Sequence, residues 1–266
     1  MHSQLIPGLP LQTFGLCVAI GVYLAWLVVE RLHGGGKDIG NLVVLMVVAG
    51  LVGARAAHVV EYWHEDGFDR DFMSAFAIWK GGLVFYGGLL AGAAAFAAWC
   101  VKRKPDVLAL TDLFCVGVPL GHAFGRIGCF FHGCCWGKVS GSFLAVTFPA
   151  GSPVYYAHHA RVGAPRSLPV LPTQLFESAA LFALFAALYV LYRRRRAYTA
   201  AAYFTGYGVI RFFMEFLRDD ERPSACGLSS AQWVSVALLA AGAVFFAWSY
   251  KRRSRQSAAA SAASAK

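Results

Sequence analysis

The chain has 266 residues, of which 58% are hydrophobic and 15% aromatic but only 14% charged. An ordinary soluble domain carries about 25% charged residues, so this composition argues against a water-soluble fold, and the aromatic content excludes an intrinsically disordered chain. The net charge of +10 comes from short basic clusters that separate long apolar runs, which indicates a membrane protein and no nucleic-acid partner.

Seven apolar runs in the chain are long enough to cross a membrane. A bilayer core about 30 Å thick needs roughly 20 apolar residues of helix, and each run approaches that length. They are approximately residues 11–29, 39–60, 81–101, 107–128, 172–192, 198–217 and 228–250. The first run lacks the basic region and cleavage site of a secretory signal, so we expect it to stay in the membrane. The sequence therefore predicts an all-α integral membrane protein with seven transmembrane helices.

Glycine recurs inside several of these runs, which favours close packing between neighbouring helices. Small residues let helix backbones approach closely in lipid, although glycine is also common in membrane helices without such contacts. The positions are Gly50, Gly53, Gly87, Gly88, Gly92, Gly117 and Gly121.

The basic residues between the runs predict the orientation. If the N-terminus lies outside, the segments that face the cytoplasm hold 14 Lys and Arg residues, against seven on the other side. Cytoplasmic loops carry the excess of Lys and Arg, so we expect the N-terminus outside and the C-terminus inside. We treat residues 1–255 as one seven-helix membrane domain. Within it, residues 137–171 should form an outer-face loop or small cap, and residues 256–266 should be a disordered Ser/Ala tail.

Three arginines and three acidic residues remain inside the predicted spans. Each costs at least ~2.5 kcal/mol at the bilayer centre, so each marks a functional site or a buried pair. They are Arg55, Arg126, Arg211, Asp112, Glu177 and Glu215.

The three arginines suggest an anion site in the outer half of the membrane. A helical rise of about 1.5 Å per residue places Arg55, Arg126, Arg211 and Glu177 in one layer. The guanidinium fork suits a phosphate, so we expect a phospholipid headgroup there. Two alternatives stay open, because Arg211 can pair with Glu215 at i, i+4 and Arg55 can bridge to a neighbouring helix. Asp112 lies apart from this layer, and we expect it to have mainly a structural role.

Glycine-rich junctions flank this layer. The stretch Gly125-Arg126-Ile127-Gly128 continues through His132 to Gly137, and we expect its glycines to break the helix and expose backbone amides to a cavity or ligand. A second junction covers residues 79–88. A third, residues 171–177, places Pro172 at the first turn of a helix.

Together these segments resemble the prolipoprotein diacylglyceryl transferase family, and they follow the family's order over most of the chain. The matching pieces are Gly53-Ala54-Arg55, Gly81 to Gly88, Asp112, Gly125-Arg126-Ile127-Gly128 through Trp136-Gly137, Pro172-Thr173-Gln174-Leu175-Phe176-Glu177, and Gly206-Tyr207-Gly208 through Arg211, Glu215, Phe216 and Arg218.

The resemblance implies an enzyme of the bacterial plasma (inner) membrane with its active site toward the outer, periplasmic side. The implied reaction transfers a diacylglyceryl group from phosphatidylglycerol to the lipobox cysteine of a preprolipoprotein signal peptide and releases glycerol phosphate. The resemblance implies no cofactor. The partners that it implies for the protein are those two substrates and membrane lipids. Arg126 and Arg211 are the two catalytic residues that the resemblance supports most strongly. His132 and Tyr86, which differ from the family's residues at their positions, complete the expected catalytic group. The expected substrate-binding group is Arg126, Arg55, Glu177, Gly87 and Gly88.

The chain departs from the family at polar residues near the reacting bond. Tyr86 stands where the family has a histidine, and its reference pKa near 10 makes it a poor base, so His132 is the candidate replacement. The other departures are Phe14 for a tyrosine, Cys129 and His132 for two asparagines, Cys134 for a glutamate and Leu171 for a histidine. The main alternative is therefore a non-catalytic paralogue that binds or translocates phospholipid.

Cys129, His132, Cys134 and Cys135 form an unusual cluster in this stretch. Thiolates and imidazole are ligands of zinc and copper, a disulfide from Cys129 to one of its neighbours would suit an oxidising face, and simple packing is the third interpretation. We expect packed or paired cysteines and no resident metal, and a metal or redox protein on this scaffold is the weakest of the functional alternatives.

Overall fold

The structure is a computed structural model of the chain, and it describes residues 13–66, 68, 71–78, 81–163, 165–195, 197–219, 224–225 and 227–264. Helices make up most of the described chain, which agrees with the predicted all-α membrane class. The chain divides into two units, residues 1–29 with 108–266 and residues 30–107. Each unit is described separately.

The first unit holds most of the helices and a small two-stranded hairpin. Its elements are α1 (Thr13–His33), α4 (Val107–His132), α5 (Pro153–Val162), α6 (Thr173–Arg195), α7 (Thr199–Met214), the 3-10 turn η3 (Glu215–Leu217), β1 (Ser224–Ala225), β2 (Leu228–Ser229) and α8 (Ser230–Ser264). The last four residues of α1 belong to the second unit. The hairpin is antiparallel, with Ser224 opposite Ser229.

An apolar core joins four of these helices. Cys115 of α4, Leu188 of α6 and Tyr203 of α7 are buried together, and Phe245 of α8 packs against them. A buried hydrogen bond links α4 to the start of α7, where Asp112 Oδ1 accepts the Ala200 N–H at 2.7 Å. A carboxylate is a favourable cap for the positive end of a helix dipole. Asp112 therefore has the structural role that we expected.

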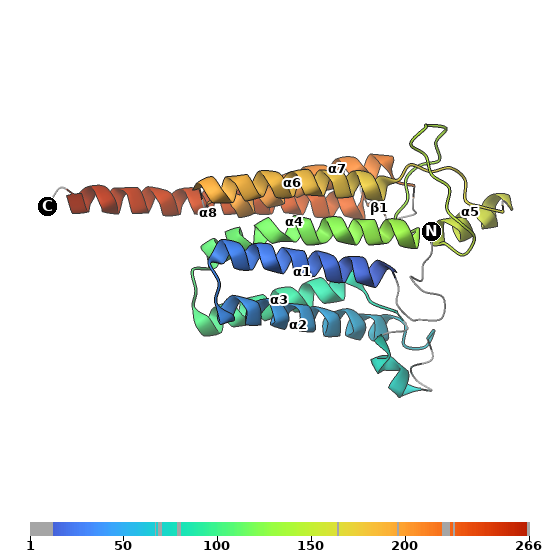
Figure 1. The fold of residues 1–266 in the computed structure, drawn as a ribbon, viewed down its shortest axis with the longest axis horizontal. Helices are drawn as coiled ribbons and strands as arrows, with labels where there is room; N and C mark the ends of the chain where they lie inside the picture. Colours follow the sequence, from blue (N-terminus) through green and yellow to red (C-terminus); the bar gives the residue numbers. More distant parts are fainter. Residues whose placement is uncertain are drawn as a thin grey trace. The chain divides into compact units, whose positions relative to one another are not determined.

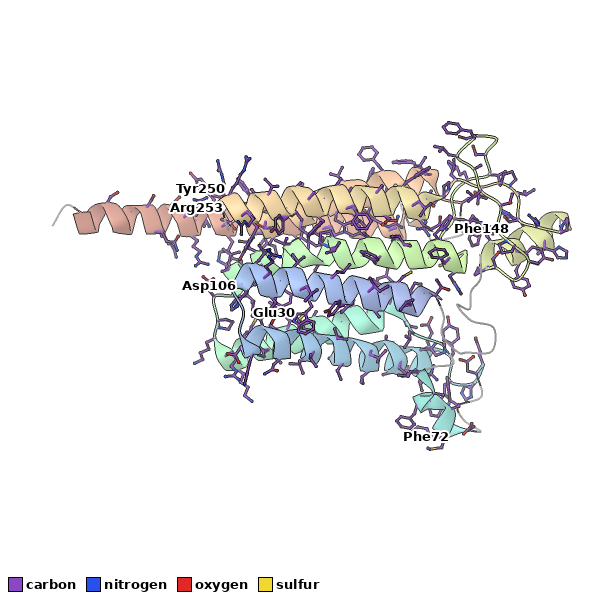
Figure 2. All side chains as sticks on the ribbon, in the orientation of Figure 1. Glu30, Phe72, Asp106, Phe148, Tyr250 and Arg253 are labelled. Atoms are coloured by element: carbon purple, nitrogen blue, oxygen red, sulfur yellow. The ribbon has the colours of Figure 1, made fainter. Side chains whose placement is uncertain are left out.

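The predicted cap, residues 137–171, has a folded interior. Phe148, Val154 and Val170 are buried together, and Phe148 is labelled within this segment in Figure 2. Backbone hydrogen bonds pair Val146 with Val170 in both directions, at 2.9 and 3.0 Å. Ser152 caps α5 by accepting the Tyr155 N–H at 3.3 Å. The segment is thus a small structured cap and not an open loop.

The second unit consists of α2 (Lys37–Glu61), the 3-10 turn η1 (Phe72–Phe76) and α3 (Phe85–Arg103). Glycines let α2 and α3 touch through their backbones. A Cβ on Gly53 would collide with Ala91 and with the Gly87 carbonyl, and a Cβ on Gly88 would lie 3.0 Å from the Gly50 carbonyl oxygen. In the first unit Gly21 of α1 meets α4 at Gly121 and Phe124 in the same way. These contacts confirm the predicted close packing at glycine.

Six helices among the described residues are long and apolar enough to cross a membrane: α1, α2, α3, α4, α6 and α8. The remaining predicted span, residues 198–217, corresponds to α7, which has 16 residues and continues into η3. The chain is therefore a multi-helix membrane protein with at least six apolar helices of spanning length.

Two predicted boundaries differ from the structure. The helix does not break at Gly125 and Gly128, because α4 continues to His132 and the first left-handed glycine of this stretch is Gly133, at φ 79°. Helical glycine is tolerated here since Gly128 lies directly against Phe14 and Cys17 of α1. Where we expected a disordered tail, α8 extends as helix to Ser264 and beyond the ends of α6 and α7 (Figure 1). Alanine, the best helix former, dominates that tail.

Candidate active site

A buried ion pair between α4 and α6 forms the centre of the candidate site. Arg126 Nη2 lies 3.0 Å from Glu177 Oε1, and the two side chains are only 14% and 1% exposed. The two atoms are within ion-pair distance but are not aligned as a hydrogen bond. Burying a charge is costly unless an opposite charge compensates it. The Glu177 carboxylate therefore offsets the desolvation cost of the buried Arg126 guanidinium.

The same guanidinium keeps one donor available. Arg126 Nε is buried and has no hydrogen-bond partner among the residues that the structure describes. Buried polar groups are nearly always hydrogen-bonded, and an exception calls for an explanation such as a ligand. An oxyanion that accepts from Nε would supply the missing partner while Glu177 still holds Nη2.

Arg211 approaches the same part of the first unit from α7. Its Nη2 donates to Glu215 Oε2 at 2.8 Å, so the i, i+4 pair that the sequence left open as an alternative is present. The charges of Arg126 and Arg211 both act on His122 and on Tyr207, whose rings lie 5.0 Å apart. The two arginines therefore converge on one buried polar region.

These pairs change the predicted charge balance. Arg126 and Arg211 each have their own glutamate, so these two pairs carry no net positive charge. The predicted excess counted Arg55 as a third arginine. An arriving phosphate must therefore share the guanidinium groups with their carboxylates.

Arg55 is bound to the backbone that precedes α3. Its guanidinium donates to the carbonyl oxygens of Ser74, Ala75, Gly81 and Gly82 at 2.7 to 3.0 Å. The group also lies 5.3 Å from the centre of the Phe68 ring. Arg55 thus anchors the connection between α2 and α3, and its predicted contact with substrate stays a prediction.

The remaining predicted residues of the second unit lie at the start of α3. Tyr86 is 61% exposed and packs edge-on against Phe85. Gly87 and Gly88 face α2, where a side chain would meet Gly53, Ala54 or Ala57. Helix packing explains both glycines, and a role of these three residues in substrate binding or catalysis stays a prediction. Trp79 and Lys80 of the same junction lie outside the described residues.

The signature stretch ends α4 and turns back toward α6. His132 is the last residue of α4, is exposed to solvent and lies 6.4 Å from the Phe14 ring. The next two residues begin a tight turn in which the Gly133 and Cys134 N–H groups both donate to the Cys129 carbonyl. The predicted base therefore lies at the C-terminal end of α4, the helix that carries Arg126.

Three cysteine thiols gather in that turn. The sulfur atoms of Cys129, Cys134 and Cys135 lie within 4.8 Å of one another, and all three thiols are free. His132 does not join this group, in contrast to the four-residue cluster that we considered from sequence. Hydrogen bonds from the Cys129 and Cys134 thiols lower the pKa of the Cys135 thiol, and the Arg218 and Arg126 charges lower it further.

Two residues of α6 were quoted in the motif without a role. Thr173 Oγ1 donates to the Cys135 carbonyl at 3.0 Å, and Gln174 Nε2 donates to the Cys134 carbonyl at 2.7 Å. Their place directly after Pro172 was the available signal, because polar side chains in a first helical turn often bind neighbouring backbone. Tyr207, which faces both arginines, was likewise missed, and only its flanking glycines marked it.

Comparison with known proteins assigns the family. The model of the family prolipoprotein diacylglyceryl transferase matches residues 2–248. The chain is 32% identical to phosphatidylglycerol–prolipoprotein diacylglyceryl transferase 2 of Clostridium perfringens, over 90% of this chain and 91% of that protein. It is 32% identical to the corresponding transferase of Burkholderia thailandensis, over 92% of each chain, and 31% identical to that of Paraburkholderia xenovorans, over 96% and 95%. The match over nearly the whole length shows that this chain belongs to the prolipoprotein diacylglyceryl transferase family.

Proposed function

We propose that this protein transfers a diacylglyceryl group from phosphatidylglycerol to the cysteine thiol of a prolipoprotein. The relatives carry these two substrates in their names. The observation that carries the proposal is the buried Arg126, which has a carboxylate on Nη2 and, among the described residues, no hydrogen-bond partner at Nε. A phosphate ester is the membrane anion that fits such a fork.

The reaction needs the departing phosphate to be stabilised. The acceptor thiolate attacks the glyceryl carbon next to the phosphate oxygen, a C–S bond forms, and the C–O bond breaks. The bond's electron pair stays on glycerol phosphate, so negative charge develops on the phosphate as it leaves. Preorganised donors in a water-poor site stabilise such charge strongly. Arg126 and Arg211 are the groups proposed for this task, with Glu177 and Glu215 fixing their orientation.

The acceptor thiol must lose its proton before it attacks. His132 is the proposed base, because its reference pKa lies near neutrality and it stands at the end of α4. Tyr86, at the family's histidine position, is the second candidate, and Arg55, Gly87 and Gly88 are proposed to bind substrate.

The proposed setting is the bacterial plasma membrane. Seven helices, including the shorter α7, would cross it with the N-terminus outside and the C-terminus inside. The 16 residues of α7 rise about 24 Å, and the three residues of η3 add a further turn. The end of α4 that carries the signature stretch would then face outward, toward emerging prolipoproteins.

The test is thioether formation on a lipobox peptide by the full-length protein in phosphatidylglycerol-containing micelles, measured by mass spectrometry. We expect turnover by the wild type, a loss of ~10² to 10⁴-fold in His132→Ala, as for a general base, and equal or higher turnover in Tyr86→His. Normal turnover by His132→Ala would remove the base assignment.

A second candidate function is lipid binding or translocation without chemistry. It is favoured by the replacement of the family's histidine by the exposed Tyr86 and of a signature glutamate by Cys134. Phosphatidylglycerol binding without turnover by any of the three proteins would select this function and reject the transferase.

A further inference from the structure

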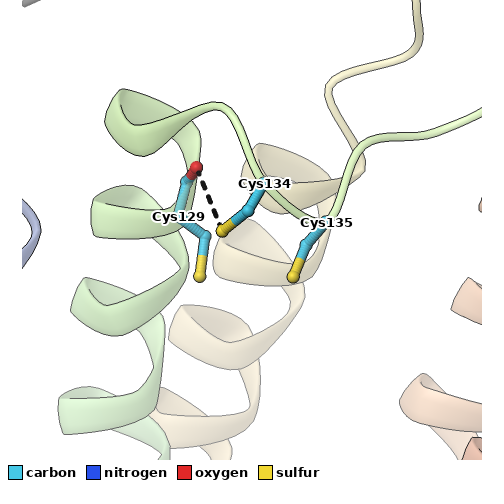
Figure 3. Close-up of side chains that lie close together, drawn as sticks. All are labelled: Cys129, Cys134 and Cys135. Carbon is cyan, nitrogen blue, oxygen red and sulfur yellow. Dashed lines mark hydrogen bonds between the residues drawn. The ribbon is translucent and has the colours of Figure 1, made fainter. Parts of the chain in front are cut away.

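Three thiols of the first unit meet just where α4 ends. The Sγ atoms of Cys129, Cys134 and Cys135 lie within 4.8 Å of one another. Figure 3 shows the three side chains converging from the last turn of α4 and the loop that follows it. All three are partly buried free thiols. The reaction described above assigns none of them a task.

Contacts from α6 hold this loop in place. Gln174 and Thr173 bind the carbonyl oxygens of Cys134 and Cys135 through their side chains. Cys135 adopts φ 63°, in the left-handed region that residues other than glycine seldom enter. Such a backbone persists only where its surroundings determine it. These contacts therefore fix the backbone that carries the Cys134 and Cys135 thiols.

The spacing of the sulfur atoms suits a thiophilic cation. Zinc–sulfur bonds are about 2.3 Å long, so two sulfurs of a tetrahedral zinc site are about 3.8 Å apart. From separations of at most 4.8 Å, the thiols need to close by about 1 Å, which small side-chain rotations provide. A disulfide would instead draw two sulfurs to about 2.05 Å and leave the third alone, and between adjacent cysteines it is strained.

We propose that Cys129, Cys134 and Cys135 bind one Zn(II) ion as three thiolates, and that the fourth coordination position receives the acceptor thiol of the substrate. Among the residues that the structure describes, no histidine or carboxylate joins the three sulfurs. Catalytic zinc sites typically have three protein ligands and one exchangeable ligand. The second half of the proposal rests on the proposed transfer function.

Such a site would activate the acceptor where the family's polar residues have been replaced. A thiol that coordinates zinc is deprotonated, and its proton passes to His132 or to water. The zinc-bound thiolate then forms the C–S bond with a sulfur lone pair, while the C–O electron pair leaves with glycerol phosphate.

Measuring the metal content of the protein tests the first half of the proposal, the binding of zinc by the three cysteines. The full-length protein, purified in detergent under reducing conditions, is incubated with Zn(II), washed and analysed for zinc. We expect about one zinc per chain in the wild type, and Cys129→Ser and Cys135→Ser should lose affinity ~10-fold or more. Cys100→Ser is the control, because Cys100 lies in α3 and outside the three-thiol group. Zinc-free reduced wild type, equal zinc in every variant, or binding of Cu(I) with no binding of Zn(II) would each overturn the assignment.

Cobalt substitution tests the open position without relying on turnover. A lipobox peptide added to the Co(II)-loaded protein should increase the sulfur-to-cobalt charge-transfer absorbance, and the same peptide with serine for cysteine should not. Identical spectra would overturn the acceptor role. Thioether assays separate the two proposals, since normal turnover by zinc-free protein rejects the acceptor role of the zinc ion and leaves the transfer function standing. No turnover by zinc-loaded protein rejects the transfer function and leaves the zinc site standing.

Discussion

The Arg126 guanidinium is held by one carboxylate and still has a buried donor for another group. Glu177 neutralises it at Nη2, and Nε has no partner in the described part of the chain. A lysine ammonium carries the same charge but only as a point, without the planar fork that binds two oxygens. Charge and geometry at this position can therefore be separated by substitution.

Arg126→Lys should reduce thioether formation about 10- to 100-fold, because one or more charge-assisted hydrogen bonds worth about 1.5–3 kcal/mol is lost. The measurement is initial rate on a lipobox peptide at several phosphatidylglycerol concentrations. Arg193→Lys, at an exposed position near the end of α6, is the matched control and should behave as wild type. Full activity of Arg126→Lys would show that the fork is not used.

Glu177→Gln should make the protein more dependent on its lipid. Removing the carboxylate leaves a buried guanidinium uncompensated, which typically costs about 3–5 kcal/mol. A phosphate at Arg126 would restore the charge balance. Phosphatidylglycerol should therefore raise the melting temperature of Glu177→Gln more than that of the wild type or of Glu61→Gln, whose side chain is exposed. Equal increments in all three proteins would contradict a phosphate at Arg126.

At the scale of the helices, packing at glycine and anchoring of loops explain most of the motif residues in the second unit. Gly53, Gly87 and Gly88 let α2 and α3 meet backbone to backbone. Arg55 binds the carbonyl groups that lead into α3. A residue pattern shared with a catalytic family thus includes positions whose visible role is to shape the scaffold.

Gly53→Ala should destabilise the protein, because its Cβ would collide with Ala91 and the Gly87 carbonyl. Overpacking of this kind typically costs about 1–3 kcal/mol. Gly15→Ala is the control, since a Cβ at this α1 position meets nothing within 4 Å and the exchange should gain up to about 1 kcal/mol of helix propensity. Thermal denaturation in detergent checks both. A melting temperature of Gly53→Ala at or above that of Gly15→Ala would argue against the backbone contact.

At the scale of the whole molecule, the distribution of charge should determine how the chain sits in the membrane. The basic segments expected in the cytoplasm hold 14 Lys and Arg residues against seven in the others. A reporter fused after Arg196 should therefore read as cytoplasmic, and one inserted near Gly151 in the cap should read as external. The opposite pattern would place the signature stretch on the cytoplasmic side and overturn the proposed encounter with exported prolipoproteins.

The periodic and compositional features of the fold were predictable. Three of these features depend on residues close in sequence: the apolar runs of spanning length, the proline that precedes α6, and the i, i+4 pair of Arg211 with Glu215. The helix end at the signature stretch was placed too early. Judged from local sequence alone, Gly125 and Gly128 were expected to end the helix. Gly128 is nevertheless helical and packs against α1.

The sequence by itself determined the membrane class, the family and the residue types that can hold a phosphate, because these follow from composition, local spacing and shared motifs. Only the tertiary structure decided which charges compensate one another. Glu177 lies 51 positions after Arg126 and reaches it only when α4 and α6 pack together. The same packing lets Thr173 and Gln174 fix the turn after α4. Contacts between residues distant in the chain depend on the packing of whole helices, which no local pattern encodes.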